Sequence, residues 1–446
     1  MARLMIGISG IRGIYGEGLD DALARRFACA FGKLSGGPVV VGRDSRVSGP
    51  ALSQAVVSGL VNAGNDVIDL GIASTPTTEM AVVSRKATGG ISITASHNPR
   101  EWNGLKFLGS DGVFISASRG EELLRLYEST TGDETGASPG THTRWDGADD
   151  HHIGAVLDLD LIDVELIRSN RFAVCIDAVN GAGGFICTEL LRRLGCTVHG
   201  IHTEPTGDFS RGAEPVPENL GDLCACVKRH GADVGFAVDP DVDRLSIVDE
   251  NGEAIGEEYT LALAADFIMG KAGGPAACNL STSRMIDDAA ERHGTVVHRA
   301  PVGEINVVEA MREHNATIGG EGNGGVILPS LHYGRDAVLG IAIILQFMAE
   351  RGKKVSGLAG EFPRYTMVKD KTGIAEKGAW VEPVKKLFDG ERMDFRDGIK
   401  VMFPVSWVHI RESNTEPIVR VIAEAPTGEE ARRLVQRVFG AIKNSL

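Results

Sequence analysis

A serine-containing loop follows a strand-like segment in the first quarter of the chain. Thr94-Ala95-Ser96-His97-Asn98-Pro99 comes after the strand-like segment Gly90–Ile93 and before Asn103-Gly104-Leu105-Lys106. A serine hydroxyl at the end of a strand is accessible, and His97 or Lys106 could serve it as a base. The loop has neither the Gly-x-Ser-x-Gly nor the Ser-x-x-Lys pattern, which speaks against the hydrolase and penicillin-binding classes. A plain polar turn at Asn98-Pro99 remains the alternative.

Three carboxylates at alternate positions, Asp239, Asp241 and Asp243, form a second reactive group directly after the apolar segment Val234–Val238. Clustered carboxylates repel one another unless a cation neutralises them, and ligands that are all oxygen select a hard ion such as Mg²⁺. A calcium EF-hand is the rival, since Glu250 is the twelfth residue counted from Asp239. It fails at the sixth position, which must be Gly and is Arg244 here.

Two further loops carry polar groups that suit a sugar phosphate. Gly320-Glu321-Gly322-Asn323-Gly324-Gly325 matches a dinucleotide fingerprint only formally, because Val326-Ile327-Leu328-Pro329 cannot open a helix. A loop that presents Glu321 and Asn323 to hydroxyls is the functional interpretation, and a glycine-rich turn is the alternative. Arg411-Glu412-Ser413-Asn414-Thr415-Glu416-Pro417 combines a guanidinium, hydroxyls and an amide, which suits a terminal phosphate, although such residues are also common in turns.

The elements that must position these loops alternate between strand-like and helix-like segments, which favours an α/β fold. The pattern predicts three similar cycles, around Val39–Leu70, Phe172–Ile201 and Asp233–Thr317. From about Gly360 it changes to that of a small α+β domain, which ends in a helix over Gly428–Ile442.

Turn-rich segments between the cycles predict the domain boundaries. Thr130–Asp150 is polar and is expected to be a surface excursion or linker, and Asp249–Glu253 has hairpin-turn chemistry. We therefore expect four domains at residues 1–150, 151–252, 253–360 and 361–446.

Composition excludes several classes of protein. The 446 residues carry 46 Lys+Arg against 60 Asp+Glu, a net charge of -14, which speaks against general affinity for nucleic acid or anionic membranes. The most apolar stretch, Ala337–Ala349, is shorter than the ~20 residues that a membrane span needs, so a buried helix is expected. The first residues lack the pattern of a secretory signal and the seven cysteines form no Cys-x-x-Cys pair, so a cytoplasmic location is expected.

In this order and at these distances, the four loops resemble the α-D-phosphohexomutase superfamily, whose members interconvert sugar 1- and 6-phosphates. Gly10–Gly13, Gly42–Arg46, Thr75-Pro76 and Asn180–Gly183 also look like signatures of that family, and the likeness covers essentially the whole chain. The resemblance implies three similar α/β/α domains plus a smaller C-terminal α+β domain. They would surround a central cleft that receives one loop from each.

The resemblance also implies roles for the transfer residues. Ser96 would be a phosphoserine that gives its phosphoryl group to the substrate, forms a hexose 1,6-bisphosphate and takes the other phosphate back. Asp239, Asp241 and Asp243 would hold Mg²⁺ together with an oxygen of the phosphorylated Ser96, and Arg244 would orient the group in transfer. Lys106 is the first candidate for general acid/base, ahead of His97, and would need a lowered pKa to act as a base.

The remaining roles concern the substrate. Glu321 and Asn323 would bind sugar hydroxyls, and Arg12 would line the cleft near Ser96. The non-reacting phosphate would be held by Arg411, Ser413, Asn414 and Thr415. The isolated histidines, His151, His152 and His332, are more often surface or core filler than ligands.

Departures from related sequences bear on the sugar. Many phosphomannomutases and phosphoglucomutases have Ser-Gly-His where this chain has Asn323-Gly324-Gly325, and bacterial phosphoglucosamine mutases commonly have Gly at the place of Asn414. Together with Glu214–Asn219, these loops look like a branch often labelled phosphoglucosamine mutase. We therefore expect an intramolecular phosphotransferase of the isomerase class acting on glucosamine phosphate, with mannose or glucose phosphate as the alternative.

The sequence leaves two other functions open. One is a non-catalytic paralogue that binds phosphosugars, and the other is a Mg²⁺-dependent phosphatase with an aspartate nucleophile in the Asp239 cluster. The expected partner is a small phosphosugar, with no nucleic acid and no membrane, and a homodimer is left open.

Overall fold

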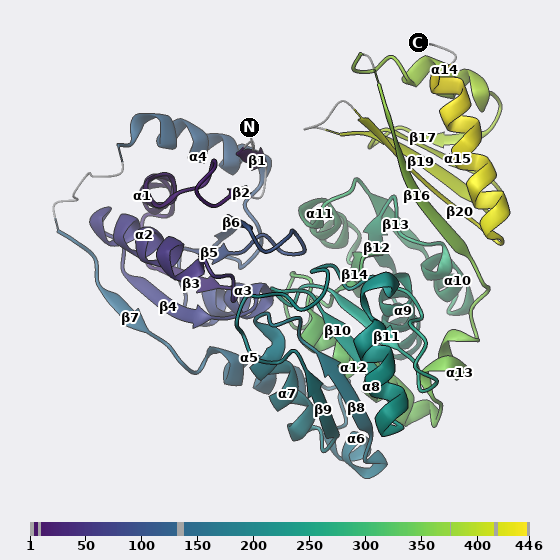
Figure 1. Ribbon diagram of the computed structural model, residues 1–446, viewed down its shortest axis with the longest axis horizontal. Helices are drawn as coiled ribbons and strands as arrows, with labels where there is room; N and C mark the ends of the chain where they lie inside the picture. Colours follow the sequence, from purple (N-terminus) through teal and green to yellow (C-terminus); the bar gives the residue numbers. More distant parts are fainter. Residues whose placement is uncertain (1–3, 8–9, 132–137, 375, 414–417, 444–446) are drawn as a thin grey trace. The chain divides into compact units, whose positions relative to one another are not determined.

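The computed structural model describes residues 4–7, 10–131, 138–374, 376–413 and 418–443. The chain folds into two compact units. Unit 1 comprises Met1–Phe267 and Asn323–Ala359, and unit 2 comprises Ile268–Gly322 and Gly360–Leu446. Within the described residues, helices alternate with strands, and the strands form four sheets (Figure 1). This arrangement agrees with the predicted fold class.

The first sheet of unit 1 holds the serine loop. Its seven strands lie in the order β1 (Met5–Gly7), β2 (Gly10–Ile14), β6 (Trp102–Gly109), β5 (Gly89–Ile93), β3 (Val39–Arg43), β4 (Val67–Ile72) and β7 (His142–Arg144). β3 is parallel to both β4 and β5, whereas β6 is antiparallel to β5 and β2.

Alternating side chains of this sheet fill two separate cores. Val39 and Val41 of β3 pack into the core that also holds side chains of α1 (Asp21–Ser35), α2 (Gly49–Asn62) and α4 (Ala117–Ser129). Val40 points to the opposite core, together with α3 (Thr75–Ser84) and the start of α5 (Ala148–Leu157). Successive side chains of a strand face opposite sides, so a strand covered on both faces is apolar throughout.

The linker predicted over Thr130–Asp150 is only partly correct. Residues 132–137 lie outside the described part of the chain, but β7 pairs in parallel with β4 and closes the first sheet, and α5 begins at Ala148. All three side chains of β7 are exposed, so this edge strand has no apolar pattern that could have predicted it.

The second sheet of unit 1 holds the carboxylate loop. Its order is β11 (Leu245–Val248), β10 (Val234–Val238), β8 (Ala173–Asp177) and β9 (Thr197–Ile201), with β10 parallel to β8 and antiparallel to β11. α7 (Gly183–Arg193) packs on β8 and β9, and α8 (Gly221–His230) on β8 and β10. The predicted turn after β11 is confirmed, since Asp249 accepts the backbone N–H groups of Asn251 and Glu253.

A largely apolar helix, α12 (Ala337–Arg351), completes unit 1. Every residue from Ala337 to Ala349 is buried, as predicted, because α12 contacts α5, α7, α6 (Val164–Asn170) and β15 (Gly325–Ile327). Asp336 caps its N-terminus by accepting the N–H groups of Val338 and Leu339. α13 (Val355–Ala359) follows α12.

The other two sheets are built mainly from residues of unit 2. β12 (Ala276–Asn279) lies between β13 (Val297–Ala300) and β14 (Ile318–Glu321) and is parallel to both. α10 (Met285–Arg292) and α11 (Glu304–His314) belong to the same stretch of chain, whereas α9 (Glu258–Ala272) begins in unit 1 and ends in unit 2. The C-terminal sheet is antiparallel, in the order β16 (Thr366–Gly373), β20 (Ile418–Ala425), β19 (Trp407–Glu412), β18 (Ile399–Met402) and β17 (Arg392–Asp394). α15 (Gly428–Lys443) covers β16 and β20 and contacts α14 (Val381–Leu387).

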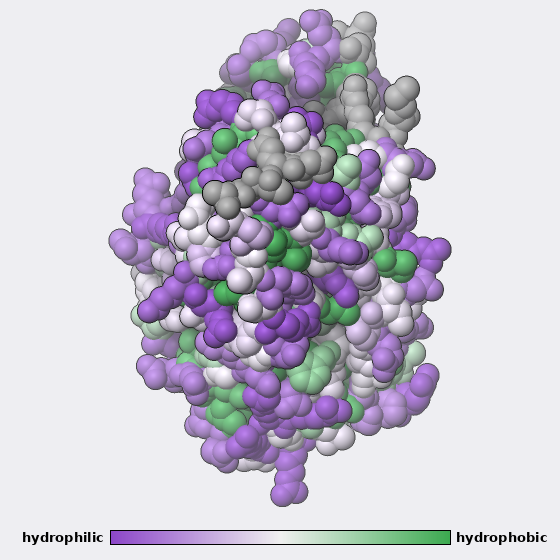
Figure 2. Space-filling model, turned by 90° about the vertical axis from the view of Figure 1, so that its left-hand side faces the viewer, coloured by the Kyte–Doolittle hydropathy of each residue, from purple (hydrophilic) through white to green (hydrophobic). Residues whose placement is uncertain are grey.

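The surface is predominantly hydrophilic on the face that Figure 2 shows, where hydrophobic side chains are scattered. Within the described residues, no helix has the length and apolar character that a membrane crossing requires.

Candidate phosphoryl-transfer site

Ser96 lies in a strained loop directly after β5. Its backbone is in the left-handed region, with φ 47°, and its side chain is largely buried. The Ser96 N–H donates to Thr94 Oγ1 at 2.9 Å, and the Thr94 hydroxyl donates to Asp44 Oδ2 at 2.7 Å. A non-glycine residue holds this conformation only when its surroundings fix it, which is the common condition of a functional loop.

A fully buried arginine supplies that fixation. Arg46 Nε donates to Asp44 at 3.0 Å, and its two terminal nitrogens donate to four carbonyl oxygens of the serine loop and its exit, those of Ser96, Asn98, Pro99 and Trp102, at 2.6 to 2.8 Å. The family resemblance marked Gly42–Arg46 as a signature but gave Arg46 no role. The structure shows that it holds the backbone around Ser96.

The carboxylate loop, which follows the second sheet of unit 1, contacts the serine loop of the first sheet. Ser96 Oγ donates to Asp239 Oδ2 at 2.8 Å. Asp239 Oδ1 accepts the backbone N–H groups of Asp243 and Arg244 at 3.1 and 3.2 Å, and a left-handed Val242, with φ 65°, turns the loop back to make this possible. The serine and the predicted metal ligands are therefore neighbours, although they lie 143 positions apart in the chain.

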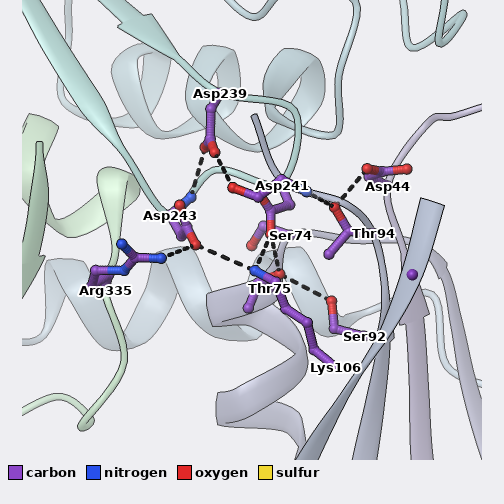
Figure 3. A network of polar contacts seen from close by, with 12 residues as sticks. Asp44, Ser74, Thr75, Ser92, Thr94, Lys106, Asp239, Asp241, Asp243 and Arg335 are labelled. Carbon is purple, nitrogen blue, oxygen red and sulfur yellow. Dashed lines mark hydrogen bonds and ion pairs between the residues drawn. The ribbon is translucent and has the colours of Figure 1, made fainter. Parts of the chain in front are cut away.

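Cationic and hydroxyl groups hold the other two carboxylates. Asp241 Oδ2 accepts from Thr75 Oγ1 at 2.6 Å and from Lys106 Nζ at 2.7 Å. Asp243 Oδ2 accepts from Arg335 at 2.5 Å and lies 3.4 Å from Lys106 Nζ. Figure 3 shows these side chains converging from α3, β6 and the segment before α12.

The donor set fits a hard divalent cation. One ligand oxygen from each of Asp239, Asp241 and Asp243 can be chosen so that all lie within 4.8 Å of one another. Oδ1 of Asp241 and Oδ1 of Asp243 are buried, and no group in the described residues donates a hydrogen bond to either. Buried acceptors that lack a donor are costly unless a cation uses them, and carboxylate oxygens suit Mg²⁺.

The charges in the cluster are strongly coupled. Burial and the neighbouring carboxylates raise the pKa of Asp239 well above its usual value. Burial also opposes ionisation of Asp243, but Arg335 and Lys106 outweigh it and hold the pKa of Asp243 below its usual range. A cation at this site would remove the repulsion among the three groups.

The two candidates for proton transfer have opposite electrostatic surroundings. Burial and the nearby Arg244 lower the pKa of His97 to about 3, so the ring is neutral at pH 7, and its Nδ1 lies 3.4 Å from Ser96 Oγ. Burial disfavours the charged form of Lys106, yet Asp241 and Asp243 outweigh it and raise its pKa. The lowered pKa that a basic Lys106 needs is therefore absent in this state.

Two arginines flank the serine loop. Arg12, on β2, donates to Asn98 Oδ1 at 3.3 Å, and Arg244 donates to Glu214 at 2.7 Å. An open cavity of about 370 Å³ lies on this side, lined among others by His97, Arg211 and Glu214. Side chains beside Ser96 are thus accessible from solvent.

The predicted sugar-binding residues lie at the end of β14 and after it. Glu321 is buried in unit 2, where its Oε1 accepts from Asn279 Nδ2 at 2.8 Å and from the Gly303 N–H at 3.2 Å. These bonds fix the orientation of the carboxylate. Asn323, in unit 1, accepts the N–H of Gly325 at 3.3 Å through Oδ1.

The predicted phosphate loop is only partly described. Arg411, at the end of β19, forms an ion pair with Asp397 at 2.8 Å, and the buried Ser413 donates its N–H to the carbonyl oxygen of Ile418. Asn414 and Thr415 lie outside the described residues.

Sequence reasoning did not predict that Thr75 or Arg335 lies near the carboxylates. Thr75 was only part of a two-residue family signature. Arg335 has one local signal, a charged residue immediately before the capping Asp336 of an otherwise apolar helix. Neither signal reveals that the side chain reaches the carboxylate loop.

Comparisons with known proteins cover nearly the whole length of the chain. Four families match in succession: phosphoglucomutase/phosphomannomutase alpha/beta/alpha domain I over residues 3–133, domain II over 150–252, domain III over 256–365 and the C-terminal domain over 367–441.

Individual proteins are similar over nearly their full length. A Thermococcus kodakarensis protein named "Phosphoglucomutase/phosphomannomutase" is 40% identical, with 99% of each chain covered. One from Methanopyrus kandleri named "Probable phosphoglucosamine mutase" is 37% identical, with 96% of this chain and 95% of the relative covered. The crystal structure of a phosphoglucomutase/phosphomannomutase family protein from Burkholderia thailandensis has a TM-score of 0.86 and 28% identity, over 99% of this chain and 98% of the other.

Proposed function

The chain belongs to the phosphoglucomutase/phosphomannomutase family, and on that premise we propose that it interconverts glucosamine 6-phosphate and glucosamine 1-phosphate. It is a phosphomutase of the isomerase class. The observation that carries the proposal is the hydrogen bond from Ser96 Oγ to Asp239 at 2.8 Å, inside a cluster of three carboxylates and Lys106.

The proposed cycle begins with phosphorylated Ser96. Its phosphoryl group passes to the free hydroxyl of a hexose monophosphate: a bond forms from phosphorus to the sugar oxygen, and the bond to Ser96 Oγ breaks. The sugar hydroxyl gives its proton to Lys106 in its neutral form or to the neutral ring of His97, and Ser96 Oγ takes up a proton from the acid so formed or from water. The resulting 1,6-bisphosphate then returns its other phosphoryl group to Ser96, which restores the phosphoserine.

Asp239, Asp241 and Asp243 would hold Mg²⁺, and the two carboxylate oxygens without a donor among the described residues support this assignment. When bound, the cation spreads the negative charge of the group in transfer. Arg244 would orient that group, and Arg12 would contact the substrate beside Ser96. We assign proton transfer first to Lys106, whose Nζ contacts both Asp241 and Asp243; a cation bound to these carboxylates would weaken the attraction that keeps the ammonium charged and so would lower its pKa.

The remaining site residues would bind the parts of the substrate that do not react. Glu321 and Asn323 would accept sugar hydroxyls, and the non-reacting phosphate would bind Arg411, Ser413, Asn414 and Thr415. Arg411 suits this role because a guanidinium makes two parallel hydrogen bonds to a phosphate. We also propose that the enzyme works in the cytoplasm on small phosphosugars.

The sugar is the most specific part of the proposal. Relatives named as phosphoglucosamine mutases support glucosamine phosphate, whereas the relative that is 40% identical carries the phosphoglucomutase/phosphomannomutase name. Mannose and glucose phosphates are the second candidates.

A coupled assay tests activity and sugar together. It offers the 6-phosphates of glucosamine, glucose and mannose in parallel, with Mg²⁺ and a trace of the matching bisphosphate. We expect kcat/KM to be highest for glucosamine phosphate, and turnover to stop with EDTA or in Ser96→Ala but to persist in Ser118→Ala, a matched change of an exposed serine. A higher kcat/KM for mannose or glucose phosphate would contradict the glucosamine assignment.

The same assay separates the two other classes. Phosphosugar binding without turnover on any of the sugars would favour a binding paralogue. Release of inorganic phosphate that survives Ser96→Ala would favour a phosphatase with an aspartate nucleophile.

A further inference from the structure

One buried cation in the cluster has no role in the proposed cycle. Arg335 is 8% exposed and donates to Asp243 Oδ2 at 2.5 Å, although 92 positions separate the two residues. A bond to a charged group is among the stronger hydrogen bonds, and this one is removed from solvent. Its effect is to occupy one oxygen of Asp243 and to fix the carboxylate plane.

The glycine-rich loop makes space for this arginine. A Cβ atom added at Gly325 would lie 2.3 Å from Cδ and 2.9 Å from Cγ of Arg335. Any side chain at position 325 therefore competes with the arginine stem. Many related loops carry His at the position of Gly325. A histidine at position 325 would occupy the volume that the Arg335 side chain fills, so the glycine and the arginine depend on each other.

The backbone on both sides of Arg335 is anchored. The N–H of Asp336 donates to Val326 O at 2.9 Å, and the N–H of Ala337 donates to Val242 O at 3.1 Å. Val242 lies between two of the proposed metal ligands. The segment that carries Arg335 is thus bonded directly to the carboxylate loop.

A buried histidine–aspartate network holds the same segment from the other side. Asp336 Oδ2 lies 2.7 Å from His152 Nε2 and 3.1 Å from His332 Nε2, and His152 Nδ1 lies 2.9 Å from Thr77 Oγ1. Thr77 is on α3, the helix whose first residue, Thr75, donates to Asp241. Two proposed ligands, Asp241 and Asp243, are therefore positioned by elements that this network joins.

We propose that Arg335 is a positioning residue for the cation site: it takes up Oδ2 of Asp243 and so directs Oδ1 to the metal, and Gly325 is the residue that admits it. Its positive charge also offsets the repulsion among the three carboxylates. This inference rests on the proposed role of Asp243 as a metal ligand. Arg335 acts through Asp243 and is not assigned contact with the substrate.

Direct titration with Mn²⁺, followed by electron paramagnetic resonance of the free ion, tests the inference on the full chain without turnover. Groups that orient metal ligands typically change metal affinity or activity by roughly 10–100-fold when removed. We expect Arg335→Met to raise the Mn²⁺ dissociation constant about 10-fold or more and to lower kcat by a similar factor. The KM for the phosphosugar should stay within about threefold of the wild-type value. Arg335→Lys, which keeps the positive charge, should retain part of the Mn²⁺ affinity and part of kcat.

Gly325→Ala is the second variant, because it displaces the arginine without removing its charge. We expect it to reproduce the loss in metal affinity, and the double variant with Arg335→Met to be no worse than the more affected single variant. The matched control is Arg351→Met, an exposed arginine at the other end of α12, which should bind Mn²⁺ as wild type does.

Asp243→Asn separates failure of the inference from failure of the site assignment. If Asp243→Asn weakens Mn²⁺ binding while Arg335→Met and Gly325→Ala bind it as wild type does, the positioning role is rejected alone. If Asp243→Asn itself binds Mn²⁺ like wild type, the proposed metal site is rejected together with the inference. A fall in melting temperature of Arg335→Met with unchanged affinity and kcat would show a structural role only and would also overturn the inference.

Discussion

Single side chains in this protein are positioned by groups that lie far away in the sequence. Ser96 is oriented by the carbonyl contacts of Arg46 and bonded to Asp239, and Asp241 is held by Thr75 and Lys106. Charge is balanced locally, since buried carboxylates face buried cations. Such a cluster is costly to assemble without its partners, because an unpaired buried charge destabilises the fold.

The residues of the proposed transfer site could be picked out from the sequence, whereas the residues that hold them in place could not. Ser96 and the three aspartates directly follow strands, so their position at strand ends can be predicted from the local pattern. Arg46 and Arg335 act over separations of 50 and 92 positions. Pairing at that distance depends on the order of strands in the sheets, which local periodicity does not encode.

Arg411→Lys tests the proposed phosphate contact at the residue scale. Lysine keeps the charge but loses the paired hydrogen bonds of a guanidinium, so we expect KM for the phosphosugar to rise about 10-fold, which corresponds to about 1.4 kcal/mol, with kcat within threefold of wild type. Steady-state kinetics give both values. The control is Arg420→Lys, since exposed Arg420 lies opposite Arg411 in the register of β19 and β20. Equal KM values for Arg411→Lys and wild type would remove Arg411 from the phosphate site.

At the scale of elements, the chain places its polar loops at strand ends and holds them by close backbone contacts. The N–H of Leu245 donates to Gly324 O, which ties the start of β11 to the glycine-rich loop. Buried elements such as α12 and β10 were predicted correctly because they are almost entirely apolar. The exposed β7 was not, since its place depends on β4 beside it rather than on its own residues.

Gly324→Ala tests the contact between that loop and β11. Gly324 has φ +91°, and an added Cβ would lie 2.3 Å from the carbonyl oxygen of Leu245. Because both the backbone conformation and the space exclude a side chain, we expect destabilisation by about 1–3 kcal/mol and a fall of several degrees in melting temperature.

Gly373→Ala provides the matched control for this change. No heavy atom lies within 4 Å of the added Cβ at Gly373, and its φ is not positive. Thermal unfolding of both variants should show a loss only for Gly324→Ala. Equal melting temperatures for Gly324→Ala and wild type would mean that the loop relaxes freely and is not fixed by β11.

At the scale of the whole molecule, the chain consists of two units that each carry part of the proposed machinery. Unit 1 contains Ser96, the three aspartates and the nearby cations, whereas unit 2 contains Glu321, Arg411 and Ser413. The sequence predicted three α/β cycles and a different C-terminal part, and the four sheets agree with that division. We retain boundaries near residues 150, 252 and 360 as a proposal.

The stability of unit 2 should depend on pH through His409. This buried ring lies 2.8 Å from Ser281 Oγ and 2.6 Å from Asp397 O, and burial lowers its pKa to about 4 from a usual 6.5. His409 is therefore protonated below about pH 6.5 in the unfolded chain, but only below about pH 4 in the folded unit. The contribution of His409 to the free energy of unfolding is fully present above pH 6.5 and is lost as the pH falls toward 4. At pH 5 the loss is about 2 kcal/mol.

His409→Gln should remove this dependence. We expect the loss of stability between pH 7.5 and pH 5, measured by denaturant unfolding, to be smaller in His409→Gln than in wild type. His151→Gln, which changes an exposed histidine of α5, should retain the wild-type dependence. Identical losses in wild type and His409→Gln would show that His409 is protonated as readily in the folded protein as in the unfolded chain.

The most direct test of the account is whether the phosphoryl group in transfer resides on Ser96. The purified protein is incubated with Mg²⁺ and a hexose 1,6-bisphosphate that is labelled in its phosphates, and is then separated from free sugar. One portion is mapped by mass spectrometry, and a second portion is mixed with unlabelled glucosamine 6-phosphate for a single turnover. We expect one labelled phosphate per chain on the peptide that contains Ser96, and transfer of that phosphate to the sugar within one catalytic cycle. Label on an aspartate of the Asp239 cluster, or turnover by a protein that carries no label on Ser96, would contradict it.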